Sequence, residues 1–231
     1  MKTLGIIGGI GPESTMEYYR TIIALFRERV GDGSFPQFII NSIDLKREIE
    51  LVAAGDDKAT TEYLLEEIGK LARAGADFGI IASNTPHIVF DEIAASSPIP
   101  LISIVEVAVT AAKSRGWKRP ALFGTRFTMH GKFYPKVFAR EGIELVPPAA
   151  ADAAYIHDKY MNELVNGNFA PEIRTRMLEI VDRMRESSGI DSVILAGTEL
   201  PLLLRDPEHN GIPFLDTMRV HAEATVRYML E

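Results

Sequence analysis

Cysteine is absent from this sequence of 231 residues. A chain without thiols cannot form disulfides, bind a metal through thiolates or use a thiol as nucleophile, acid or base. The sequence also lacks any apolar run near the roughly 18 residues that a membrane-spanning helix needs. Residues 1–8 are a short apolar run that leads straight into a glycine loop, unlike a secretory signal peptide. We therefore expect a cytoplasmic protein with no membrane partner.

Positive charge is scarce as well, because 25 Lys and Arg residues face 32 Asp and Glu residues, a net charge of −7. No basic run interleaved with aromatic residues is present, which argues against a nucleic-acid partner. The 5 histidines show no metal-ligand spacing such as H-E-x-x-H, so we expect no metal. The loop Gly9-x-Gly11-x-x-Ser14 lacks the third glycine of a dinucleotide fingerprint, and Asp44 lies too far along for the ribose contact. We therefore expect no cofactor.

What the sequence does contain is a repeated order of helix, glycine and short apolar strand. Glycine suits the left-handed residue that ends a helix, so it marks the turn into each strand. Strands that are apolar on both faces are typical of a parallel sheet covered by helices. The pattern predicts strands at 78–82, 121–123, 143–146 and 193–195. Amphipathic periodicity predicts helices at 15–30, 58–74, 104–115, 172–187 and 216–230.

This alternation predicts an α/β fold, and a weak repeat predicts that it occurs twice. The segment 4–8 resembles 121–124, since each is a strand that runs into a glycine and a helix. In the same way 80–85 resembles 194–199. We therefore expect two similar doubly wound parallel-sheet lobes with the site between them. The first lobe is predicted to span 1–100 plus 215–231, and the second 101–214.

Small polar residues gather where the predicted strands end, which is where ligands bind in open α/β sheets. The clusters are Gly8–Ser14, Asn41–Asp44, Ser83–Thr85, Gly124–Arg126 and Gly197–Glu199. Free N–H groups and the dipole at helix starts favour an anion such as a carboxylate. Ser, Thr and Asn are also ordinary helix caps, so a single cluster would mean little. Five clusters together favour a ligand site.

These clusters resemble the motifs of a known family, the aspartate/glutamate (Asp/Glu/hydantoin) racemases. Gly8–Thr15 is similar to the opening loop of that family, and Ser83–His87 to its Cys-Asn-Thr-x-His motif. Gly124–Met129 is similar to its second-lobe loop, and Gly197–Pro201 to its Gly-Cys-Thr-Glu-Leu motif, with Gly197 at the cysteine position. The resemblance continues through 156–167 and 213–217, so it covers the whole chain in order.

The resemblance implies a specific enzyme design. Racemases of this family hold an amino acid between two pseudosymmetric lobes, and a cysteine from each lobe faces one side of the α-carbon. One thiolate removes the proton while the other thiol supplies a proton on the opposite face. The family uses no pyridoxal phosphate and no metal, and it commonly forms homodimers. The resemblance therefore implies an isomerase, an amino-acid racemase without a cofactor, that acts as a homodimer.

The chain departs from this design at the decisive positions, because Ser83 and Gly197 stand where the two catalytic cysteines belong. A serine hydroxyl is far less acidic than a thiol and needs an adjacent base, and glycine has no side chain. The two-thiol mechanism therefore cannot operate here. Cofactor-independent acid–base chemistry at the substrate α-carbon would need other groups.

Three hypotheses explain the missing thiols. In the first, the chain is a superfamily enzyme with altered one-sided chemistry such as decarboxylation or elimination, and Gly197 opens space for a larger substituent. Its candidate acid–base groups are Ser83, His87, Thr198, Glu199 and Glu13, although Glu199 would also favour a helix start without any catalytic role. In the second, the chain is a non-catalytic homologue that binds a carboxylate or an amino acid. In the third, the cysteines were removed on purpose to trap a ligand, which a glycine at 197 does not favour.

Under the binding hypothesis, Arg47 lies where the family carries an arginine that grips a substrate carboxylate. A guanidinium can pair with such a group through two hydrogen bonds, although Arg47 also suits a solvated charged run. The other predicted substrate-binding residues are Gly11, Asn84, Thr85, Thr125, Thr128 and Thr198. The sequence thus predicts a racemase-like protein that binds a small amino or dicarboxylic acid.

Overall fold

The computed structural model describes residues 1–231, which divide into two compact units. The first unit comprises Met1–Ile104 and Met218–Glu231, and the second comprises Val105–Thr217. Each unit is built around its own sheet and its own apolar core.

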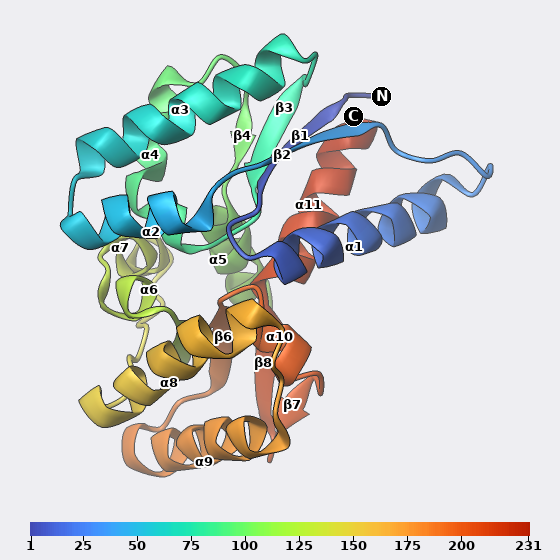
Figure 1. Ribbon diagram of the computed structural model, residues 1–231. Coiled ribbons are helices and arrows are strands. Elements are labelled where there is room, and N and C mark those ends of the chain that lie inside the picture. Colours follow the sequence, from blue (N-terminus) through green and yellow to red (C-terminus); the bar gives the residue numbers. More distant parts are fainter. The chain divides into compact units, whose positions relative to one another are not determined.

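The sheet of the first unit has the strand order β2-β1-β3-β4, and all its strands run parallel. The strands are β1 (Leu4–Gly8), β2 (Phe38–Ser42), β3 (Phe78–Ile81) and β4 (Leu101–Ile102) (Figure 1). Because β1 lies between β2 and β3, the chain first builds outward on one side of β1 and then on the other. The crevice at such a switch point, beyond the carboxyl ends of the strands, is where open sheets bind ligands.

Alternate residues of β1 enter different cores because strand side chains point to opposite faces. Leu4 and Ile6 pack in a cluster with α1 (Pro12–Val30) and α11 (Thr217–Leu230), whereas Ile7 packs in a cluster with α3 (Asp57–Arg73). Both faces of the sheet are therefore covered, which explains why the strand reads as a continuous apolar run. The helical segments of this unit are α1 (Pro12–Val30), α2 (Leu45–Ala54), α3 (Asp57–Arg73), the 3-10 helix η1 (Thr85–Val89), α4 (Phe90–Ser96) and α11 (Thr217–Leu230).

The sheet of the second unit has the order β5-β6-β8-β7. The strands are β5 (Pro120–Gly124), β6 (Ser192–Ala196), β7 (Glu208–His209) and β8 (Ile212–Asp216), with β7 antiparallel and the others parallel. The helical segments are α5 (Ile104–Ser114), α6 (Arg126–His130), α7 (Phe133–Ala139), α8 (Ala150–Asn162), η2 (Leu164–Asn166), α9 (Pro171–Ser188) and α10 (Leu200–Leu203) (Figure 1). Together the two sheets confirm the predicted α/β class with two sheet-centred lobes.

The strand predicted at 143–146 does not form as a regular strand. Only an isolated parallel bridge joins Val146 to Ala121 on the outer side of β5. Pro147 and Pro148 follow at once and have no N–H to continue the ladder, so pairing stops there. The bridge still occupies the place beside β5 that β2 occupies beside β1, and it preserves the repeated strand order.

Candidate functional site

The loop after β1 has a shape that only glycine permits. Gly9 has φ of 82° and Gly11 has φ of 105°, both in the left-handed region. A Cβ on Gly9 would also overlap the Ser42 hydroxyl and the Ile43 backbone. The loop is held from inside by the Thr15 hydroxyl, which accepts from Gly9 N at 2.9 Å. Gly11 offers no side-chain cap to α1, so the helix start is formed by backbone alone.

Arg47 lies in the first turn of α2, after the end of β2. The helix start is ordered by Asp44, whose carboxylate accepts from Lys46 N at 2.9 Å. The Arg47 side chain is exposed, and its guanidinium lies 4.5 Å from the centre of the Tyr63 ring on α3. No carboxylate of the chain forms an ion pair with it. The guanidinium is thus held in place by a ring while its hydrogen-bond donors stay available.

Ser83 lies two residues beyond β3 and is half-buried. Its hydroxyl forms no hydrogen bond with a neighbouring base, so the structure shows no group that would activate it. Asn84 and Thr85 follow at the start of η1, and both are buried. The three polar residues after β3 therefore lie at one sheet edge with the loop after β1, because β1 and β3 are paired in parallel.

His87 is a fully buried, neutral histidine. Its Nε2 accepts from Ile104 N at 3.2 Å, and its ring stacks on Phe90 with centroids 4.9 Å apart. Burial, helped by the nearby His221, lowers the pKa of His87 from 6.5 to about 3. The proton therefore sits on Nδ1, which has no well-aligned partner. These contacts hold η1 against the start of α5, and a catalytic role for His87 stays a prediction.

In the second unit, the loop after β5 is closed by two buried threonines. Thr125 caps α6 by accepting from Thr128 N at 3.3 Å, and the two hydroxyls lie 3.3 Å apart. His157 on α8 secures the same turn, because its Nδ1 accepts from Arg126 N at 3.2 Å. Burial and the Arg126 charge lower the pKa of His157. Thr125 and Thr128 thus lie together, and their role in substrate binding stays a prediction.

Gly197 directly follows β6, at the position that the motif resemblance assigns to the second family cysteine, and the space beside it is filled. A Cβ on Gly197 would overlap the ring of Tyr160, lying 3.0 Å from Cζ and 3.2 Å from Cδ2. The expectation that Gly197 opens space for a larger substituent is therefore wrong. The ring enters from α8, whose buried side includes Tyr160.

Thr198 and Glu199 are both almost fully buried and are tied to this tyrosine. The Tyr160 hydroxyl donates to Glu199 Oε2, and the Thr198 hydroxyl donates to the same oxygen at 3.1 Å. Burial and the neighbouring carboxylate raise the pKa of Tyr160 well above 10. The phenol is thus a neutral donor, and Glu199 holds it in place.

Three buried polar atoms in the first unit lack well-aligned hydrogen-bond partners, and only one of their residues, Glu48, lies outside the motifs that the sequence indicated. They are Ser14 Oγ, Glu48 Oε1 and His87 Nδ1, which follow β1, β2 and β3 respectively. Burial raises the pKa of Glu48 from 4.5 to about 7. Glu48 was missed because it stands in a charged run and looks like a solvated residue. Only the packing of α2 shows that its side chain is buried.

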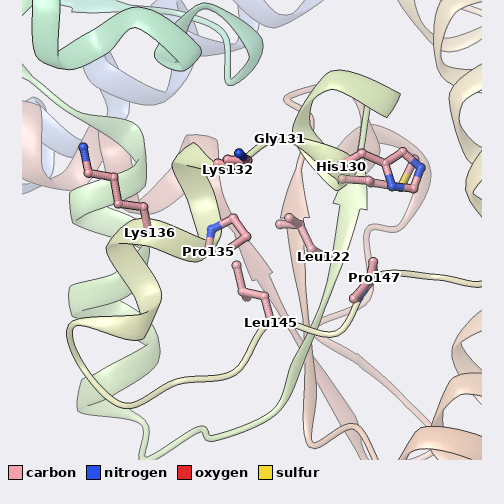
Figure 2. Close-up of a pocket in the computed structure, with 9 residues that line it drawn as sticks. Leu122, His130, Gly131, Lys132, Pro135, Lys136, Leu145 and Pro147 are labelled. Carbon is pink, nitrogen blue, oxygen red and sulfur yellow. The ribbon is translucent and has the colours of Figure 1, made fainter.

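A pocket of about 500 Å³ in the second unit contains none of the predicted site residues. Its lining includes Leu122, Leu145 and Pro135, with Lys132 and Lys136 at the side (Figure 2). The Lys136 ammonium group points away from the apolar floor (Figure 2). The pocket is thus mainly an apolar hollow beside α7, separate from the polar strand ends.

Two further features bear on the range of possible sites. No group of three or more His, Asp or Glu side chains is placed to hold a metal ion. None of the helices combines the length with the apolar character that crossing a membrane requires.

Comparison with known proteins gives a family match over nearly the whole chain. Residues 7–225 match the model of the Asp/Glu/hydantoin racemase family. The broad specificity amino-acid racemase RacX of Bacillus subtilis is 24% identical over 232 residues, which cover 96% of each chain.

Solved structures agree over the full length. An aspartate racemase homologue from Pyrococcus horikoshii is 32% identical with a TM-score of 0.82, and all of both chains is covered. A protein from Yersinia pestis, described as a candidate Asp/Glu racemase, is 30% identical with a TM-score of 0.87, again with full coverage.

Proposed function

Because this chain belongs to the Asp/Glu/hydantoin racemase family, we propose that it binds a small amino or dicarboxylic acid without two-thiol chemistry. The observation that carries the proposal is Arg47, an exposed guanidinium that is steadied by the Tyr63 ring and has no ion-pair partner. Such a group pairs well with a carboxylate. In this proposal Arg47 binds one carboxylate of the ligand.

The remaining hydrogen bonds are assigned to small polar groups at the strand ends. Gly11, Asn84 and Thr85 belong to the first unit, whereas Thr125, Thr128 and Thr198 belong to the second. Backbone N–H groups at helix starts add to these donors. Their number suits a ligand with two charged ends, such as aspartate or glutamate.

The groups at the thiol positions favour binding over racemisation. Ser83 has no adjacent base, and Gly197 has no side chain and is covered by Tyr160. His87 stays neutral and uses Nε2 as an acceptor for a backbone N–H. Losing one positioned acid or base typically costs about 10²–10⁴ in rate, and here two are replaced. We therefore propose a cofactor-free binding protein, with one-sided chemistry at Ser83 or Glu199 as the second candidate.

Isothermal titration with L-aspartate, L-glutamate and L-malate tests the binding proposal. We expect Arg47→Ala to weaken binding at least about tenfold, equivalent to about 1.4 kcal/mol, because a charge-assisted pair is lost. Arg29→Ala is the matched control, since Arg29 is also exposed and lies at the far end of α1. Equal effects of the two substitutions, or no binding of any of these acids, would refute the proposal.

Proton NMR in D₂O separates binding from turnover. Each acid is incubated with the protein, and the α-proton signal is followed over time. We expect the signal to persist, because no thiol is available to remove the proton. Loss of the signal would favour the second candidate, and Ser83→Ala, His87→Asn and Glu199→Gln would then identify the working group.

We also propose that the chain is a cytoplasmic homodimer. Met16 and Tyr19 on α1 and Ile40 on the edge strand β2 are large apolar side chains with at least 38% exposure. Tyr19 contacts Phe38 of the same strand, so these elements present apolar surface together. Sedimentation analysis tests the dimer, with Tyr19→Asp expected to shift the protein to monomer. Cell fractionation tests the location.

A further inference from the structure

Gly197 has no backbone reason to be glycine. It is absent from the glycines with positive φ, so a side chain would cause no strain in the main chain. All three atoms nearest to a built Cβ belong to the Tyr160 ring. The residue type at 197 is therefore set by a side chain that lies 37 positions earlier in the sequence, on α8.

The Tyr160 ring cannot simply move aside. Its hydroxyl donates to Glu199 Oε2, and that oxygen is also bonded to the Thr198 hydroxyl. Glu199 itself has 1% exposure and Tyr160 has 6%. The ring is part of the main apolar cluster of the second unit, together with Phe123 and Ile156. It is thus fixed at its tip by hydrogen bonds and along its body by packing.

We infer that Tyr160 determines the specificity of the second unit, because its ring occupies the volume that an acid–base side chain at position 197 would need. This inference deepens the proposed function and rests on it for its chemical meaning. The ring closes the polar edge beyond β6, and its hydroxyl is committed to Glu199 rather than to a ligand.

The closure has a stereochemical consequence. Inverting an α-carbon requires a base on one face and a proton donor on the other. With position 197 covered by the Tyr160 ring, no acid–base side chain can act from that position. The two-base inversion that uses a side chain at position 197 is therefore closed to this chain.

Thermal unfolding of four proteins tests the steric part: wild type, Gly197→Ala, Tyr160→Ala and the double variant. We expect Gly197→Ala to lower Tm by about 5 °C when Tyr160 is present, since overpacking a full core is destabilising. In the Tyr160→Ala background the same change should leave Tm unchanged or raise it. An equal loss in both backgrounds would overturn the inference.

Gly69→Ala is the matched control, because its Cβ would meet only the flexible end of Arg73 within helix α3. We expect this change to leave Tm unchanged or raise it, with no dependence on Tyr160. If Tyr160→Ala fails to fold, Tyr160→Leu removes the outer ring atoms while keeping apolar volume. The same comparison of Gly197→Ala in the two backgrounds then decides the outcome.

Activity tests the chemical part. Ser83→Cys with Gly197→Cys should exchange the α-proton of L-aspartate in D₂O at least about tenfold more slowly than the same pair combined with Tyr160→Ala. Chiral chromatography should find D-aspartate only with the triple variant. Equal and measurable exchange rates would overturn the inference. If neither variant exchanges the α-proton but the Tm pattern is as expected, the result would count against aspartate as the substrate and would still support the steric role of Tyr160.

Discussion

At the residue scale, serine and glycine stand at the two positions that the motif resemblance assigns to the family's cysteines, and the Tyr160 ring covers Gly197. The sequence alone gives this assignment, through the motifs around Ser83 and Gly197. It could not reveal Tyr160, since no local pattern links residue 160 to residue 197. Contacts between distant segments depend on how α8 packs near the end of β6, and a single sequence does not encode that in any short motif.

Glu48 gives a prediction at the same scale, because it is a buried carboxyl whose pKa is raised to about 7 from 4.5. The folded state then keeps a proton that the unfolded chain releases between pH 4.5 and 7, so this group lowers stability as pH rises through that window. We compare the free energy of unfolding of Glu48→Gln with that of wild type at pH 4.5 and at pH 8. We expect this difference to shift in favour of Glu48→Gln by up to about 3 kcal/mol as the pH is raised from 4.5 to 8. Urea denaturation at both pH values measures it.

Any constant cost of burying the glutamine amide cancels in this comparison, because only the change between the two pH values is read. Glu50→Gln serves as control, since Glu50 is exposed on the same helix. A stability difference that stays flat with pH would show that Glu48 ionises as an ordinary carboxyl.

At the scale of elements, amphipathic period and glycine position predicted the long helices well. The helix expected at 172–187 is α9 (Pro171–Ser188), and the one expected at 58–74 is α3 (Asp57–Arg73). The strand predicted at 143–146 did not form. The prediction relied on the apolar residues of this segment and gave too little weight to the two prolines that follow it. Short elements such as β7 and α10 were not predicted, since two to four residues are too few to show a helical or strand period in hydrophobicity.

Two buried histidines tie elements of the first unit together and give a pH prediction. His221 on α11 accepts from the Tyr18 hydroxyl at 2.8 Å through Nδ1, and its Nε2 donates to Ile102 O at 3.0 Å. Burial lowers the pKa of His221 to about 4 and that of His87 to about 3. Because a carbonyl only accepts, Nε2 of His221 carries its proton and the ring is neutral.

Because the pKa of each histidine is lowered by folding, the unfolded chain binds protons below pH 6.5 that the folded chain does not bind. Stability from these two groups is fully present above the unfolded pKa of 6.5 and falls as pH drops toward 4, by about 1.4 kcal/mol per pH unit for each histidine. Two histidines contribute to this slope of stability against pH. We expect His221→Asn to remove about half of their joint contribution. Denaturant titrations from pH 7 to pH 4.5 measure the slope.

His130→Asn is the control for this experiment, because His130 is exposed at the end of α6. It should leave the slope unchanged. If His221→Asn also leaves the slope unchanged, then the buried histidines do not control the acid sensitivity of the fold.

At the scale of the whole molecule, the chain ends in a unit other than the one it has just completed. Strand β8 belongs to the second unit, whereas α11 directly after it packs Met218, Val226 and Met229 against the sheet of the first unit. The weak repeat in the sequence indicated two lobes, and the resemblance of 213–217 to a closing strand and helix placed the last helix. The prediction assigned 215–231 to the first lobe, but it could not name the side chains through which the helix packs there.

Native-state hydrogen exchange tests this organisation. We expect amides of α11 to share the protection of α1 and β1 rather than that of β8, because they open with the core they belong to. Met229→Ala, at a site with 0% exposure, should cost about 2–5 kcal/mol and reduce protection in α1, β1 and β3. Protection in β5 and β6 should be retained. Equal losses in both sheets would mean that the units unfold as one.

The pairing of Tyr160 with Gly197 also limits how a thiol could be introduced by mutation. Glycine and cysteine codons can be a single base apart, so one base change is enough to place cysteine at position 197. With the Tyr160 ring in place, the new side chain would overpack a filled core. A smaller residue at position 160 would relieve the overlap, but by itself that change leaves a cavity. A well-packed thiol at position 197 therefore requires two coupled substitutions, neither of which is favourable alone.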